Sequence, residues 1–208
     1  MTLSDRPAAR AKLVGGRLCL DFVNTVGGRS DAVRDERLTE YADLLAWGLR
    51  VGVLAEADAA RLLRESRRRV KEAAQVFARA LALREAIWHL CHAVIGGAPA
   101  EASDLEVLNR ELAAACGRAR LAAREGNFAW EWAGARGELD EVLWRVADST
   151  AEMLTTSDLT RLRECRGDDC GWLFEDASRN RSRLWCDMGD CGNLAKVRRF
   201  RRRGMARG

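Results

Sequence analysis

The segment that decides the predicted fold is CRGDDCGWLFEDASRNRSRLWCDMGDCGNLAKVRRFRRR, residues 165–203. It contains Cys165 and Cys170, then an interval of 15 residues, then Cys186 and Cys191. Two cysteine pairs at this separation are typical of a site in which four thiolates hold zinc tetrahedrally. We therefore predict that these four cysteines bind a structural Zn²⁺ with no open coordination position.

Disulfides and four reduced thiols are the alternatives, and the composition favours neither. Residues 161–208 contain few apolar side chains, and a unit this small usually needs a metal or disulfides to fold. The first residues lack the apolar stretch of a signal peptide, so we expect a cytoplasmic protein, in which disulfides are rare. Gly171 and Gly192 follow the second cysteine of each pair and predict tight turns, with an intervening hairpin that brings the pairs together.

The residues after Cys191 predict a basic helix, with Asn193 as its N-cap and an end near Arg202. Three apolar residues recur along it and are expected to pack against the cysteine turns: Leu194, Val197 and Phe200. The remaining positions are mostly basic, and a second basic group lies between the cysteine pairs. The predicted nucleic-acid contacts are Arg179, Arg181, Arg183, Asn193, Lys196, Arg198, Arg199, Arg201, Arg202 and Arg203.

The charge distribution separates this segment from the rest of the chain. Residues 161–208 contain 13 Lys and Arg against 7 Asp and Glu, whereas residues 1–160 contain 22 and 24. A basic helix held on a zinc site predicts binding to the phosphate backbone of double-stranded DNA, in or near a major groove. The alternatives are a solvated tail, or an adaptor that docks onto RNA or an acidic protein surface.

The first part of the chain, residues 13–160, predicts a helical bundle. Residues 18–29 favour a short helix over a strand, and helices are expected at about 39–51, 56–66, 68–95, 103–116 and 138–155. Residues 118–123 and 128–132 predict a hairpin around Gly126. The fold class is therefore mainly α: a helical bundle with a small β-hairpin, followed at 161–208 by a treble-clef-like zinc finger of hairpin and basic helix.

The cysteine segment resembles the CGNR zinc finger, which is named after a Cys-Gly-Asn-Arg motif. LCLDFVNTV (residues 18–26) and RDERL (residues 34–38) resemble the ABATE domain, which commonly precedes that finger. The resemblance covers nearly the whole chain and implies a bacterial transcription regulator with a link to stress. Leu194 and Leu184 stand where the family has arginines. These departures predict weaker DNA binding or weaker base recognition, without an effect on zinc.

The bundle contains no motif of a common enzyme class, and we do not expect an enzyme, although one in the helical domain stays an alternative. Asp21, Asn24, Thr25 and Arg37 are either a buried polar network or a binding site for a small-molecule effector. His89 and His92 could join a metal site but more often lie at a helix surface. We expect no membrane-spanning helix, and a homodimer would suit two DNA half-sites.

Overall fold

The computed structural model describes residues 2–29, 34–132 and 138–205, with side chains up to Arg201. The described α-helices are α1 (Leu18–Val23), α2 (Tyr41–Arg50), α3 (Glu56–Arg68), α4 (Val70–Gly96), α5 (Ala102–Cys116), α6 (Glu141–Thr156) and α7 (Asn193–Met205). Three antiparallel hairpins are β1 (Val26–Gly27) with β2 (Asp35–Glu36), β3 (Ala119–Arg124) with β4 (Asn127–Trp132), and β5 (Leu162–Glu164) with β6 (Leu173–Glu175). The predicted mainly α fold is confirmed.

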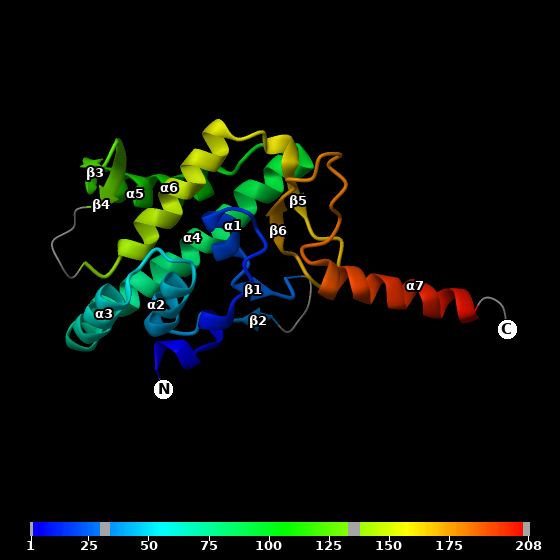
Figure 1. Cartoon of the computed structure of the whole chain (residues 1–208), viewed down its shortest axis with the longest axis horizontal. Helices are drawn as coiled ribbons and strands as arrows, with labels where there is room; N and C mark the ends of the chain where they lie inside the picture. The colour runs from blue at the N-terminus through cyan, green and yellow to red at the C-terminus, as the bar shows by residue number, and fades with distance from the viewer. Residues whose placement is uncertain (1, 30–33, 133–137, 206–208) are drawn as a thin grey trace.

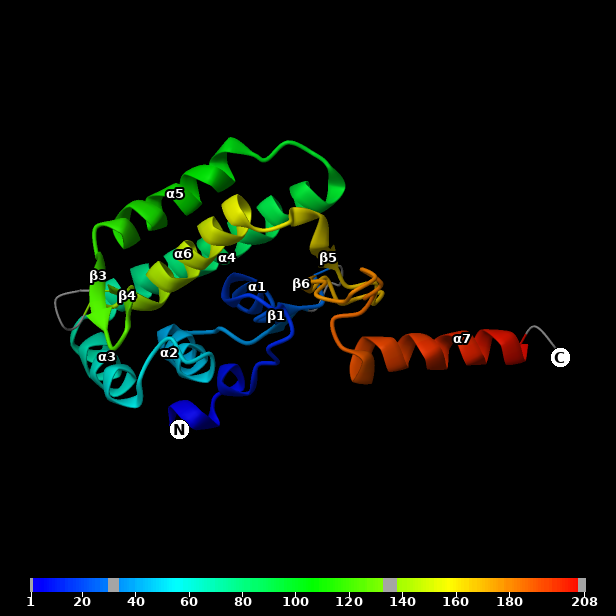
Figure 2. The ribbon, with the colours of Figure 1, turned by 45° about the horizontal axis from the view of Figure 1, so that its top comes forward.

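The long helix α4 is the centre of the bundle. Helices α5 and α6 lie beside it, α2 and α3 pack toward one end, and α1 packs on α4 and α6 (Figures 1 and 2). The apolar stripe of α4 is buried, including Ala80, Leu83 and Ile87, because residues three and four apart share one helix face. Within the described residues, none of the helices has the length and apolar character needed to cross a bilayer.

The N-terminal segment differs from its predicted helix at 18–29. The helix α1 ends at Val23, and the chain then forms the short strand β1 against β2. Two charged side chains fix this hairpin on α4: Arg84 donates to both carboxylate oxygens of Glu36, at 2.7 and 2.6 Å. Arg84 is buried, and a bidentate pair of this kind is among the strongest polar contacts in a protein interior.

The C-terminal cysteine segment shares part of its core with the bundle. Leu162 in β5 and Leu173 in β6 belong to the same buried cluster as the helices. The sequence predicts a hairpin between the two cysteine pairs, but β5 and β6 instead flank the first pair, because this pairing lets both leucines enter the main core. The helix α7 leaves the body of the molecule and projects away from the bundle (Figures 1 and 2).

Candidate metal centre and basic helix

Four cysteine sulfurs converge at the junction of the β5–β6 hairpin with the start of α7. Their Sγ atoms all lie within 4.8 Å of one another, and both Cys170–Cys186 and Cys186–Cys191 are 3.6 Å apart. A tetrahedral ion with metal–sulfur bonds of about 2.3 Å requires sulfurs about 3.8 Å apart. The cluster therefore has the dimensions of a closed, four-coordinate metal site.

Backbone amides point at the sulfurs of the first cysteine pair. The amides of Gly167 and Cys186 donate to Cys165 Sγ at 3.4 and 3.2 Å. A Cβ atom on Gly167 would lie 3.1 Å from Cys191 Sγ, so this position has little room for a side chain. The sequence predicts sulfur-directed turns at Gly171 and Gly192. The turn at Gly171 is confirmed, because its backbone is left-handed (φ 66°) and the following amide, that of Trp172, hydrogen-bonds to Cys170. Gly167, inside the first pair, is a further glycine that approaches the sulfurs. No signal in the spacing distinguishes it.

The proximity of four thiols determines their ionisation. Hydrogen bonds with Cys170 and Cys186 lower the pKa of Cys165. The hydrogen bond with Cys165 raises the pKa of Cys170 and that of Cys186, while burial raises that of Cys191. One thiolate is thus favoured over four, because adjacent negative charges repel each other. A bound cation would allow all four to ionise, so the donor set fits a metal.

The first cysteine pair is held by contacts from the bundle. Asn24 makes two hydrogen bonds to the backbone of Leu173, and the indole of Trp172 donates to the carbonyl of Val26 at 3.0 Å. The indole of Trp88 donates to the carbonyl of Gly171 at 3.2 Å. The metal site is therefore supported by α1, β1 and α4 as well as by its own segment.

The helix α7 begins differently from its prediction. A π-helical turn, Met188–Gly192, leads into it, and the side chain of Asp187 caps that turn by accepting from the amide of Gly189 at 2.7 Å. Asn193 already has helical dihedrals, so it is not the N-cap. Its side chain is exposed.

The apolar stripe of α7 does not pack against the cysteine turns, and that prediction is wrong. Leu194, Val197 and Phe200 are 56%, 40% and 79% exposed. The reason is the direction of the helix, which leaves the body at its first turn and projects away from it (Figure 1).

Two family models match the chain in the order expected. Residues 16–157 match ABATE, described as "Putative stress-induced transcription regulator", and residues 161–204 match the CGNR zinc finger. The chain belongs to the ABATE family. Its C-terminal CGNR finger, hereafter the finger, contains all four clustered cysteines. A comparison with curated proteins finds no match.

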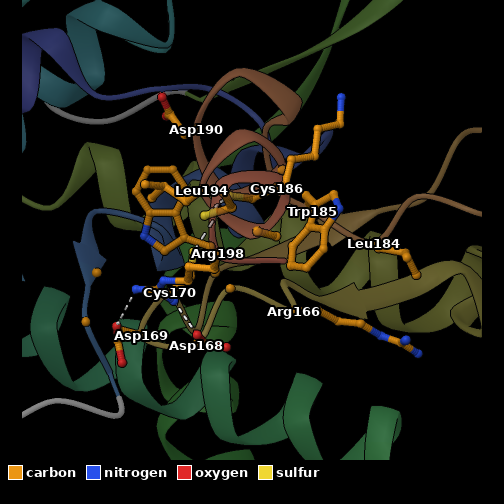
Figure 3. Close-up of a pocket in the computed structure, with 18 of the residues that line it drawn as sticks. Arg166, Asp168, Asp169, Cys170, Leu184, Trp185, Cys186, Asp190, Leu194 and Arg198 are labelled. Carbon is orange, nitrogen blue, oxygen red and sulfur yellow. Dashed lines mark hydrogen bonds and ion pairs between the residues drawn. The ribbon is translucent and has the colours of Figure 1, made fainter. Parts of the chain in front are cut away.

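The predicted basic contacts on α7 divide into three groups in this ABATE protein. Lys196, Arg199 and Arg201 are exposed on α7. Arg198 is also on α7 but forms ion pairs with Asp168 and Asp169 in the loop of the first cysteine pair (Figure 3). The backbone of Arg202 and Arg203 continues α7, and their side chains lie outside the described part of the chain.

The three arginines between the cysteine pairs have different surroundings. Arg179 is exposed, and Arg181 donates to Asp158 at 2.9 Å and to Thr160 at 2.7 Å. Arg183 stacks on the ring of Phe174, with 4.1 Å from its guanidinium carbon to the ring centroid. Its guanidinium also donates to three carbonyl oxygens, those of Val14 (2.8 Å), Trp185 (3.1 Å) and Cys186 (2.5 Å). Arg183 is therefore engaged inside the ABATE protein, and the surface available for phosphate lies mainly on α7.

The four predicted effector residues do not surround a common space. Asp21 accepts from the amide of Gly15 at 2.8 Å, and burial raises the pKa of its carboxyl. Asn24 and Thr25 are buried in contacts with the ABATE protein's own backbone and with Arg84. Arg37 alone of the four borders a groove, beside the finger.

His89 and His92 approach separate carboxylates. His89 Nδ1 lies 3.1 Å from Asp104, and His92 Nδ1 lies 3.4 Å from Glu164. His92 also stacks on Trp88 with ring centroids 4.7 Å apart. Among the described residues, the cysteine cluster is the group with three or more converging metal-ligand atoms, and neither histidine belongs to it.

Proposed function

We propose that this ABATE protein is a transcription regulator that binds double-stranded DNA through α7, with a structural Zn²⁺ at the four cysteines. The observation that carries the proposal is the position of α7. The helix begins directly after the four-cysteine centre, and its exposed face is rich in Lys and Arg. Four thiolates at tetrahedral spacing favour Zn²⁺, and a site without an open position gives the ion a structural role.

The chemistry of the exposed α7 residues supports recognition of phosphate. Lys196, Arg199 and Arg201 are exposed and present positive charge along a helix that projects from the body (Figure 2). Neutralising DNA phosphates releases condensed counterions, so the affinity falls as salt rises, with a slope of about −0.9 per contact. The fixed base of α7 would orient these residues on the duplex.

A titration of the full-length, zinc-loaded protein with a labelled duplex at several salt concentrations tests the proposal. The variant Lys196→Ala/Arg199→Ala/Arg201→Ala should weaken binding and reduce the salt slope by about 2.7 for three lost contacts. The matched control Arg64→Ala/Arg67→Ala/Arg110→Ala removes three exposed arginines from α3 and α5, away from the finger. Equal binding by the two variants would contradict a role for α7.

Single-stranded nucleic acid is a second candidate because of Phe200. This ring is 79% exposed and lies among arginines on α7. Exposed aromatic rings stack on unpaired bases, at about 1–3 kcal/mol for each base. A comparison of duplex with single strand separates the candidates: Phe200→Ala should leave duplex binding largely unchanged and weaken single-strand binding only if stacking occurs.

A further inference from the structure

An open groove lies where the ABATE segment meets the finger. Its volume is about 890 Å³, and we call it the junction groove (Figure 3). Gly28 and Arg37 border it from the β1–β2 hairpin, whereas Trp172, Trp185, Leu194 and Arg199 border it from the finger. Small-molecule sites have volumes of about 300–1,000 Å³ and often lie between domains. The groove is therefore of a suitable size and position for a small ligand.

The acidic residues of the junction groove already have cationic partners. Asp35 pairs with Arg37 at 3.1 Å, Asp168 and Asp169 pair with Arg198, and Asp190 pairs with Lys12. Figure 3 shows Arg198 beside Asp168 and Asp169 in the groove. Because Arg198 faces two carboxylates, these pairs leave one negative charge uncancelled. Cys170, Cys186 and Cys191 also line the groove, and with zinc bound the four-cysteine centre would add a formal charge of −2.

Three cationic side chains of the lining, unlike its carboxylates, make no ion pair within the described residues. They are those of Arg166, Lys196 and Arg199. These three cations offset the remaining carboxylate and the zinc centre, and each could pair with the charged group of an anionic ligand. A neutral or cationic ligand would gain nothing from these three charges.

The rest of the lining combines apolar and aromatic side chains with three of the four clustered cysteines. Trp172 is 7% exposed, and its indole is fixed by the hydrogen bond to Val26. Trp185, Leu184 and Leu194 add further apolar surface to the groove (Figure 3). Flat apolar groups bind well against indole rings, whereas inorganic phosphate would leave this surface in contact with water.

We propose that the junction groove binds a small organic anion with a flat apolar body, and that this anion is an effector of the protein. The ligand would place its charged group near Arg166, Lys196 or Arg199 and its body against the tryptophan and leucine side chains. Because Lys196 and Arg199 are also proposed DNA contacts, the bound anion should lower the affinity for duplex. This regulatory consequence rests on the proposed function, whereas the binding site itself does not.

Calorimetric titration of the full-length, zinc-loaded protein with naphthalene-2-sulfonate tests the site directly. Two matched probes separate the contributions. Naphthalene-2-sulfonamide has the apolar body without the charge, and inorganic phosphate has the charge without the apolar body. A charged hydrogen bond is worth about 1.5–3 kcal/mol, so the sulfonate should bind at least about tenfold more tightly than the sulfonamide. It should also bind more tightly than phosphate. Equal affinities for all three probes would overturn the proposal.

Two variants connect the binding to the groove. One removes the three cations, Arg166→Ala/Lys196→Ala/Arg199→Ala, and the other places a negative charge at an exposed apolar position, Leu184→Glu. Each should weaken sulfonate binding about tenfold or more. The control variant, Arg64→Ala/Arg67→Ala/Arg110→Ala, should not change it. Circular dichroism and zinc content confirm that each variant is folded. Unchanged sulfonate binding in both groove variants would overturn the proposal.

Duplex binding with and without saturating naphthalene-2-sulfonate is a separate measurement. Coupling between two ligands is reciprocal, so a sulfonate that weakens duplex binding must itself bind less tightly to the duplex complex. Failure of the sulfonate to bind would refute the groove and leave duplex binding intact. Failure of the protein to bind duplex would refute the proposed function and leave the calorimetric result intact.

Discussion

The side-chain amide of Asn24 makes two hydrogen bonds to the backbone of Leu173: Oδ1 accepts from the amide at 2.9 Å, and Nδ2 donates to the carbonyl at 2.8 Å. Asn24 is 2% exposed and follows α1, whereas Leu173 lies in β6, directly after the first cysteine pair. The amide therefore satisfies the backbone of a short strand as a neighbouring strand would. It couples the ABATE segment to the metal-binding finger.

Replacing Asn24 by Ala should destabilise the whole protein. The substitution leaves the buried amide and carbonyl of Leu173 without these partners, which costs about 2–4 kcal/mol. Urea unfolding followed by circular dichroism measures this change, and Asn109→Ala at an exposed position of α5 is the control. We also expect faster loss of zinc to a chelator, and a variant as stable as Asn109→Ala would contradict the coupling.

Removing one cysteine ligand should remove the metal. Elemental analysis of the purified protein should find one zinc ion per chain, and Cys191→Ser should reduce this content strongly, because the site has no spare ligand. Cys116→Ser changes an exposed cysteine outside the cluster and should retain the metal. Equal zinc contents in the two variants would exclude the four-cysteine site.

Metal removal should affect more than the finger. Leu162 and Leu173 belong to the core of the bundle, so loss of order around the cysteines should also lower the midpoint of bundle unfolding. The α-helical signal should persist after chelation, since most of the core comes from residues before 160. A bundle melting temperature that does not depend on zinc would mean that β5 and β6 keep their packing without the metal.

Leu194→Arg should tighten duplex binding. Leu194 is 56% exposed at the start of α7, so an arginine there can reach phosphate without disturbing a core. One additional contact should increase the magnitude of the salt slope by about 0.9. Leu105→Arg on α5, where Leu105 is 38% exposed, adds the same charge away from the finger and should not change the slope.

Arg183→Ala should lower stability and zinc retention without changing the salt slope. Its guanidinium donates to three carbonyl oxygens around the second cysteine pair, and their loss should cost about 2–4 kcal/mol. Arg183→Lys should not restore the stability, since an ammonium cannot reproduce the planar contacts. A smaller salt slope at unchanged stability would instead indicate a phosphate contact.

The ionised carboxyl of Asp43 should make the free energy of unfolding fall in acid. Burial alone would raise the pKa of this carboxyl, but hydrogen bonds from Arg6 and Thr39 outweigh burial and hold its pKa below the ordinary 3.8. A group with a lowered pKa in the folded state stabilises the protein above its unfolded pKa, and this contribution disappears as pH falls through the folded pKa. Unfolding free energies of Asp43→Asn should therefore depend less on pH below about 4 than those of the native chain.

The clustering of the four cysteines and the mainly α fold could be predicted from the sequence alone. The spacing of Cys165, Cys170, Cys186 and Cys191 reports a metal site because short loops bring each pair together whatever surrounds it. Helical periodicity is equally local, and so the helices of the bundle lie close to their predicted ranges. The basic character of α7 also follows from the sequence alone.

The contacts of the polar residues and the burial of the apolar residues depend on long-range packing, which local sequence patterns do not report. Asn24 and Leu173 are 149 positions apart, and a local sequence pattern cannot relate two residues at that separation. Arg183 and Lys196 are both basic residues of the finger, yet the first is engaged by carbonyls and the second is exposed. Phe200 has the spacing of a buried residue but is exposed, because burial depends on whether another element lies opposite, and α7 projects from the body.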